Sequence, residues 1–369
     1  MQENKFQLPK EPLRFSAQDL GELLAYCSQI GASDITLQTD EPVVVEVSGR
    51  IYKISKHKLT NAEVGDLLNA IYGPNGTAQI LSGKDVDTHY EFRPSRVERY
   101  RFRVNGTGCM SAGHEAIQLT LRTIPTEPPA LSSLELPPEI VDAIAPHDGV
   151  VYVTGATGSG KSTLLAAIIG ELCQDPLSNR KILTYESPIE FVYDALEKPS
   201  SVVSQTEIPR HLPSFAMGVR NALRRKPHAI LVGEARDAET IAAVLEAALT
   251  GHPVYTTLHT NGVAETVRRL VGSFPAEERM GRTIDIIETL RLIIWQKLVP
   301  SVDGGRVALR EYLVFTEELR DKLLKVDPDN ITAAVRDLVK TNGRTMQVDA
   351  KEKFEKGLIS ERDYKLLSI

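Results

Sequence analysis

A glycine-rich stretch, GATGSGKST at residues 155–163, is the part of the sequence whose residue types and spacing point most directly to chemistry. Its glycines let the backbone curl so that successive N–H groups face one anion. Lys161 adds a mobile charge for β and γ phosphates, and the Ser162 hydroxyl is a candidate Mg2+ ligand. Because an apolar strand pattern precedes the loop and a helical pattern follows it, a chance turn is disfavoured. The predicted nucleotide-binding residues are Gly155, Ala156, Thr157, Gly158, Ser159, Gly160, Lys161, Ser162 and Thr163.

Polar side chains follow three further apolar runs that are typical of strands. KILTYESPIEF delivers Glu186 and Glu190, HAILVGE delivers Glu234, and PVYTTLH delivers His259. In an open α/β sheet, ligands bind at the carboxyl ends of the strands, so we expect these side chains beside the phosphate loop. A carboxylate there can activate water or hold a metal, and a histidine can sense the γ phosphate. We therefore predict catalytic functions for Glu190, Glu234 and His259, count His259 among the nucleotide-binding residues as well, and leave Glu186 open.

The division of labour between the two glutamates stays open from sequence alone. Gly233 precedes Glu234 at a position where many nucleotide hydrolases carry a Mg2+-binding Asp. Glu234 is then expected to serve the metal together with Ser162, which makes Glu190 the better general base. His252 follows a helix end, so interaction with the helix dipole competes with a role at the site.

The elements that must position these residues follow from the hydrophobic pattern. From about residue 146, short apolar runs alternate with helical patterns, which is typical of a mainly parallel sheet covered on both faces. Before it, helical patterns at 16–31 and 61–73 and strand patterns at 33–54 and 98–124 predict an α+β module with a mostly antiparallel sheet. The stretch TIDIIETLRLIIWQKLV at 283–299 carries charges among its apolar residues, so we expect an amphipathic helix.

A proline-rich segment separates the two patterns. PTEPPALSSLELPPEI has five prolines in sixteen positions, and proline neither continues a helix nor sits in a central strand. We therefore expect an N-terminal domain at 1–124, a semi-extended, hinge-like linker at 125–145, and a second domain at 146–369 with a C-terminal helical part.

Composition excludes several classes of protein. The net charge is −6, which argues against a chain that mainly coats nucleic acid. Cys27, Cys109 and Cys173 have no CxxC or CxxH spacing, so a disulfide framework or a zinc site is not expected. The N-terminus lacks the apolar core of a signal peptide, and no uncharged apolar run reaches about 18 residues. We expect a cytoplasmic protein.

Four segments together resemble the signature boxes of the secretion-superfamily ATPases, in the order that this family shows. They are GATGSGKSTLLAAII, ILTYESPIEFVY, ALRRKPHAILVGEARDAETI and TGHPVYTTLHTNGVAETVRRLVGSFP. The resemblance implies a PAS-like N-terminal domain followed by a RecA-like ATPase domain, with ATP and Mg2+ as cofactors. It also implies a homohexamer at the cytoplasmic side of the inner membrane. The implied partners are inner-membrane secretion-system components, including other secretion ATPases. These partners would attach the ring to the membrane peripherally. Direct binding of nucleic acid is not expected.

The resemblance further implies that arginines of the N-terminal domain reach the γ phosphate. The matching positions are Arg103 in RFRVN and Arg122 in LRTIP, with Arg101 a weaker candidate. Such charges offset the negative charge that develops on the transferred phosphoryl group. Arginines paired on an exposed sheet face are the alternative. Arg220 and Arg224 also match family positions, with a solvated helix face as their alternative.

Two departures from the family pattern direct the functional prediction. Ser187 replaces the Asp of the usual E-D-P-I-E box, and the A-I-R-x-G-x run of pilus-retraction motors is missing near the C-terminus. The chain thus looks more like the ATPases of Dot/Icm type IVB secretion systems. We predict ATP hydrolysis that turns the N-terminal domain about the linker and powers substrate translocation. Pilus retraction is the nearer alternative; a RecA-like nucleic-acid motor and a nucleotide-gated adaptor are the rivals.

Overall fold

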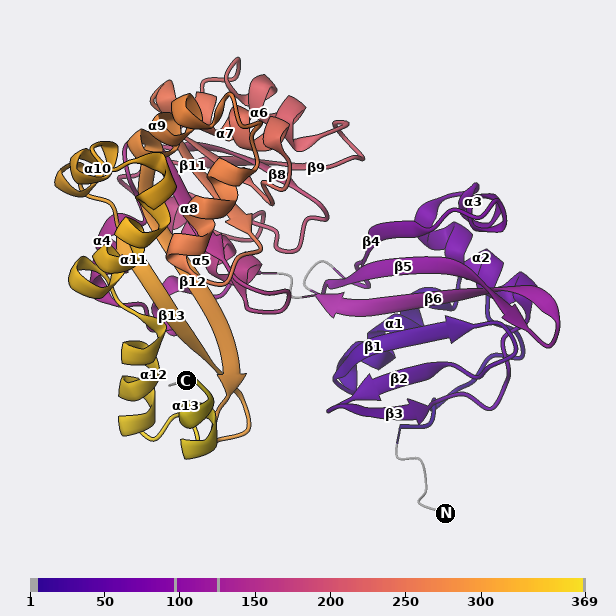
Figure 1. The fold of residues 1–369 in the computed structure, drawn as a ribbon. Helices are drawn as coiled ribbons and strands as arrows, with labels where there is room; N and C mark the ends of the chain where they lie inside the picture. Colours follow the sequence, from indigo (N-terminus) through magenta and orange to yellow (C-terminus); the bar gives the residue numbers. More distant parts are fainter. Residues whose placement is uncertain (1–5, 96–97, 125–126, 368–369) are drawn as a thin grey trace. The chain divides into compact units, whose positions relative to one another are not determined.

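The computed structural model describes residues 6–95, 98–124 and 127–367. The chain divides into two compact units, Met1–Thr126 and Glu127–Ile369 (Figure 1). Pro125 and Thr126, where the predicted linker begins, lie outside the described residues.

The first unit is an antiparallel sheet with helices packed on it. Its strand order is β3-β2-β1-β6-β5-β4, and Figure 1 shows the long β5–β6 hairpin within it. The strands are β1 (Ala32–Gln38), β2 (Val44–Val47), β3 (Arg50–Lys53), β4 (Val86–Phe92), β5 (Tyr100–Ser111) and β6 (His114–Ile124), and the helices are α1 (Leu20–Gln29), α2 (Asn61–Tyr72) and α3 (Gly76–Leu81). Apolar residues of α1 and α2 share one buried core with alternate residues of the strands, while the residues between them on β5 are mostly exposed.

The second unit is built around a mainly parallel sheet of order β13-β12-β7-β11-β10-β8-β9. Its strands are β7 (Gly149–Thr154), β8 (Lys181–Glu186), β9 (Val202–Glu207), β10 (Ala229–Val232), β11 (Pro253–Leu258), β12 (Leu290–Pro300) and β13 (Arg306–Val314). All neighbours are parallel except β12 and β13. The carboxyl ends of β7, β11, β10 and β8 therefore meet at one edge, as the sequence predicts.

Helices cover both faces of this sheet. They are α4 (Pro138–Ala143), α5 (Lys161–Gln174), α6 (Phe215–Ala222), α7 (Ala238–Leu249), α8 (Val263–Gly272), α9 (Arg279–Thr289), α10 (Glu317–Leu324), α11 (Ile331–Asn342), α12 (Met346–Glu355) and α13 (Glu361–Leu367). Helices α4 and α5 share a core with one face, and α6 to α11 share a core with the other. Figure 1 shows α12 and α13 beside the far end of the β12–β13 hairpin, where Val299 and Leu309 pack against Met346 and Ala350.

The stretch at 283–299 is not one helix, so that prediction was wrong in its second half. Helix α9 ends at Thr289, and β12 begins at Leu290 and lies between β7 and β13. Ile293 packs into the core on one face of the sheet and Ile294 into the core on the other. A strand buried on both faces has no alternating pattern, which is why periodicity did not separate it from a buried helix.

The described part of the predicted linker is folded onto the second unit instead of being semi-extended. A short 3-10 helix at Leu131–Leu134 precedes α4. Leu131, Ile140 and Ile144 are buried in the core beside α5, and the Tyr255 hydroxyl donates a hydrogen bond to the Ile144 carbonyl over 2.8 Å. Proline fits this fold because Pro138 starts α4, where an N–H group has no helical partner.

Across residues 6–95, 98–124 and 127–367, no helix combines the length and the apolar character that crossing a bilayer requires.

Candidate active site

The phosphate loop joins β7 to α5 and is packed closely against β12. Gly155 has φ +146°, and a Cβ on it would lie 2.3 Å from the Gln296 carbonyl oxygen. Gly160 has φ +82°, and a Cβ there would lie 2.9 Å from the Gln296 side-chain nitrogen. Both positions thus need glycine for conformation and for space. At the end of the loop, on the first turn of α5, Ser162 is exposed and Thr163 is half-buried.

Lys161 lies at the centre of the charged groups around this loop. Its ammonium donates hydrogen bonds to the carbonyl oxygens of Gly155 over 3.0 Å and Ala156 over 2.9 Å. Burial lowers the pKa of Lys161, and the charges of Glu234 and Glu190 oppose that shift. Both predicted carboxylates therefore act on the same lysine, which is the arrangement that the strand ends predicted.

Glu234 is the carboxylate with the best-defined partners. One of its oxygens, Oε1, lies 2.7 Å from Arg236 Nε and 3.3 Å from His259 Nε2. The pKa of His259 is lowered by burial and by the charges of Lys161 and Arg236, while Glu234 opposes the shift. These surroundings favour the neutral imidazole over the charged one. Arg236 was missed in the sequence, although it stands two residues after Glu234 in GEARD.

The two glutamates after β8 have different surroundings. Glu190 is half-buried, and its charge acts on Lys161. Glu186 is buried and accepts hydrogen bonds from the Thr184 hydroxyl over 2.6 Å and the Gln205 amide over 3.1 Å. Glu186 thus contacts β9 through Gln205, which explains its burial without a role at the phosphates.

In the first unit, Arg103 and Arg122 face one another across the β5–β6 pair. Arg103 forms an ion pair with Asp87 over 2.9 Å, and Arg122 forms one with Asp34 over 2.9 Å. The side chains of both arginines are exposed, at 43% and 68%. Asp34 stands directly opposite Arg122, whereas Asp87 stands opposite Asn105 and reaches Arg103 diagonally. Exposed ion pairs of this kind are weak enough to exchange partners.

The other arginine candidates have different surroundings. Arg101 is 2% exposed and lies 3.6 Å from Glu91, so it is part of the packing of the first unit. Arg220 pairs with Glu239 over 2.9 Å on an exposed helix face, and Arg224 is also exposed. His252 approaches the Ala247 carbonyl over 3.1 Å, as a histidine at a helix end does.

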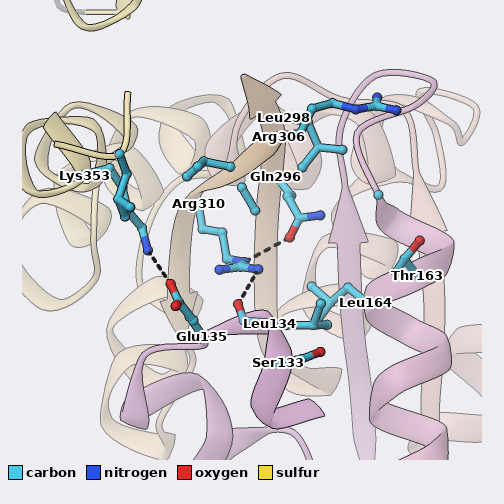
Figure 2. Close-up of a pocket in the computed structure, with 14 residues that line it drawn as sticks. Ser133, Leu134, Glu135, Thr163, Leu164, Gln296, Leu298, Arg306, Arg310 and Lys353 are labelled. Carbon is cyan, nitrogen blue, oxygen red and sulfur yellow. Dashed lines mark hydrogen bonds and ion pairs between the residues drawn. The ribbon is translucent and has the colours of Figure 1, made fainter. Parts of the chain in front are cut away.

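A pocket of about 380 Å3 borders the phosphate loop at Gly160, Thr163 and Leu164 (Figure 2). Its remaining walls come from the 3-10 helix, β12, β13 and the C-terminal helices. Figure 2 shows Arg310 bonded to both Gln296 and the Leu134 carbonyl, and Lys353 paired with Glu135. Sequence reasoning missed this pocket because its walls come from segments far apart in the chain.

Comparison with known proteins identifies the family. Residues 96–365 match the family model described as "Type II/IV secretion system protein". The chain belongs to this family. The crystal structure of the ATPase DotB from Legionella pneumophila is 66% identical, covers 99% of both chains and superposes with a TM-score of 0.86. DotB from Yersinia pseudotuberculosis is 33% identical, with a TM-score of 0.84 over 99% of this chain and 97% of that one.

A pilus-retraction ATPase is also similar. PilT from Pseudomonas aeruginosa is 35% identical over 353 residues, which cover 94% of this chain and 96% of that protein. A structure of PilT with bound ADP superposes with a TM-score of 0.81 at 33% identity. These findings confirm the predicted family, the fold class and the ATPase activity: a RecA-like parallel-sheet ATPase domain follows an α+β, PAS-like domain.

Proposed function

We propose that this ATPase powers substrate translocation through a type IVB secretion system. The observation that carries the proposal is the 66% identity to Legionella pneumophila DotB over 99% of both chains, against 33% to the PilT structure. The Ser187 substitution and the missing A-I-R-x-G-x run support the same choice. Pilus retraction is the second candidate, because PilT is similar over nearly the whole chain.

The triphosphate is expected to bind at residues 155–163, with its nucleoside in the pocket at Thr163 and Leu164. The support is geometric: the pocket borders the loop at Gly160 and the first turn of α5 at Thr163 and Leu164. On binding, Lys161 exchanges its two carbonyl contacts for phosphate oxygens. This exchange is favourable because a buried ammonium gains an opposite charge.

Ser162 and Glu234 are the residues that would hold Mg2+. Both are oxygen donors, the Ser162 hydroxyl is exposed at the start of α5, and Glu234 acts on the same lysine as the phosphates would. The ion, when bound, neutralises charge on the β and γ phosphates. Because Arg236 and His259 already orient Glu234, Glu190 is the residue we assign to deprotonating the attacking water.

At the level of the assembly we propose a homohexamer on the cytoplasmic face of the inner membrane. Arg103 and Arg122 would leave Asp87 and Asp34 and supply positive charge to the transferred phosphoryl group. Inner-membrane secretion components, including other secretion ATPases, would hold the ring peripherally. Hydrolysis would then be converted to a movement of the N-terminal domain.

Complementation tests the assignment. A strain deleted for the gene should recover effector secretion with the wild-type chain but not with Glu190→Gln, because that variant binds ATP without turning it over. Pilus-dependent motility measured in the same strains separates the alternative. If the wild-type chain restored motility but left secretion at the level of the deletion strain, retraction would be favoured. Full secretion with Glu190→Gln would favour a nucleotide-gated adaptor.

A further inference from the structure

The buried side-chain amide of Gln296, on β12, contacts the phosphate loop. The Gln296 side-chain nitrogen donates a hydrogen bond to the Ser159 carbonyl oxygen over 2.7 Å. Gln296 is 3% exposed and Ser159 is 5% exposed, so water does not compete for this bond. The contact fixes the Ser159–Gly160 peptide, whose N–H group belongs to the curl that would face phosphate.

Arg310 fixes which way this amide points. Its Nε donates to the Gln296 Oε1 over 2.9 Å, and a terminal nitrogen donates to the Leu134 carbonyl over 3.1 Å (Figure 2). A guanidinium has donors but no acceptor, so Arg310 requires the Gln296 oxygen on its side. The amide nitrogen is thereby directed at Ser159.

Arg310 is in turn attached to the C-terminal helices. Its backbone N–H donates to the Asp349 Oδ2 over 2.9 Å, and Asp349 lies on α12 and forms an ion pair with Arg344 over 2.9 Å. Arg310 and Asp349 are each 4% exposed. Burying a charge costs free energy, and close partners offset only part of that cost. A buried series of contacts of this kind therefore contributes more to a defined geometry than to the stability of the fold.

We propose that Arg310 is a positioning residue for the phosphate loop, acting through Gln296 and anchored to α12 by Asp349. The inference rests on the proposed ATP site and deepens it. A loop held in its anion-binding shape before nucleotide arrives loses less entropy on binding. Loss of the hydrogen bonds that link Arg310, Gln296 and Ser159 therefore weakens binding of the phosphates, whatever base the nucleotide carries.

The experiment uses the full-length chain and two ligands. Fluorescent ATP and inorganic tripolyphosphate, as a competitor without a nucleoside, give Kd values for wild type, Gln296→Leu, Arg310→Met and the double variant. Each single substitution should raise both Kd values about tenfold, as loss of one buried hydrogen bond implies. The double variant should be no weaker than Gln296→Leu alone, since Arg310 acts through Gln296. Arg310→Lys, which keeps the charge but lacks the planar fork that reaches Gln296 and Leu134 together, should lie between wild type and Arg310→Met.

Arg320 supplies the matched control. It donates to the Phe315 carbonyl over 2.6 Å and the Leu290 carbonyl over 3.4 Å. Leu290 pairs with Val150 near the start of β7, at the opposite end of that strand from the loop. Arg320→Met should lower the melting temperature and leave both Kd values unchanged.

Three results would overturn the inference: additive effects in the double variant, an Arg310→Met variant that weakens ATP but not tripolyphosphate, or an equal loss in Arg320→Met. If Arg310→Met does not fold, Gln296→Leu and Arg310→Lys carry the same comparison. A wild-type chain that bound neither ligand would instead remove the proposed ATP site itself.

Discussion

At the scale of single residues, the site is a buried lysine shared by two carboxylates with different surroundings. Arg236 and His259 hold Glu234 from two sides, whereas Glu190 lies on the loop after β8. The partners of Glu234 hold its carboxylate in one orientation, which suits a metal ligand. We therefore propose Glu190 for proton transfer, and the two proposed roles differ in what each substitution should do.

Glu190→Gln should keep ATP affinity near that of wild type and reduce kcat by about 10²- to 10⁴-fold, which is the usual contribution of a general base. Glu234→Gln should instead raise the Mg2+ concentration that gives half-maximal hydrolysis. Phosphate release measured across a Mg2+ titration separates the two. Near-normal kcat in Glu190→Gln would remove it from the role of base.

At the scale of elements, the start of α2 carries a testable electrostatic feature. Glu63 is 1% exposed and accepts hydrogen bonds from the Phe15 N–H over 2.7 Å and the Thr60 N–H over 2.8 Å. His57 Nε2 lies 2.9 Å from the same carboxylate. Burial by itself would raise the pKa of Glu63, but the hydrogen bonds from Thr60, His57 and Phe15 outweigh it and lower the pKa to about 2.

Because the folded pKa lies below the unfolded one, Glu63 stabilises the fold above pH 4.5 and loses that contribution as pH falls through about 2. Glu63→Gln should lower the free energy of unfolding of α2 by about 2 kcal/mol at pH 7, because an amide cannot accept all these bonds. Hydrogen exchange over α2 peptides measures the difference between variant and wild type. That difference should shrink as pH falls from 4.5 towards 2.

Asp66→Asn is the control for this prediction, since Asp66 is on the same helix and pairs with Arg14 at the surface. It should change stability by less than about 0.5 kcal/mol. An equal effect of both variants, or an effect of Glu63→Gln that does not depend on pH, would contradict the prediction.

The features that the sequence predicted well depend on residues that are close together in the chain. The glycines of the phosphate loop and the polar residues after β8, β10 and β11 stand beside the elements that position them. What it missed depends on contacts between distant segments. The Gln296–Arg310 chain joins β12 to β13 and the 3-10 helix, and β12 itself reads as a helix because it is buried on both faces.

At the scale of the whole molecule, the fold is kept while the sequence diverges. TM-scores of 0.86, 0.84 and 0.81 accompany identities of 66%, 33% and 33% to two DotB structures and one PilT structure. The fold alone therefore does not separate secretion from pilus retraction. Our proposal of secretion therefore rests partly on local departures such as Ser187. ATP hydrolysis is common to both candidate functions.

The most direct test of the account is phosphate release by the purified chain in Mg2+ and ATP, with the mass of each fraction determined by light scattering. Wild type should release phosphate in fractions that contain six chains. Lys161→Ala should release none, because it lacks the charge that holds the β and γ phosphates. Phosphate release by Lys161→Ala at the wild-type rate, or none from wild type at any ATP concentration, would contradict the account.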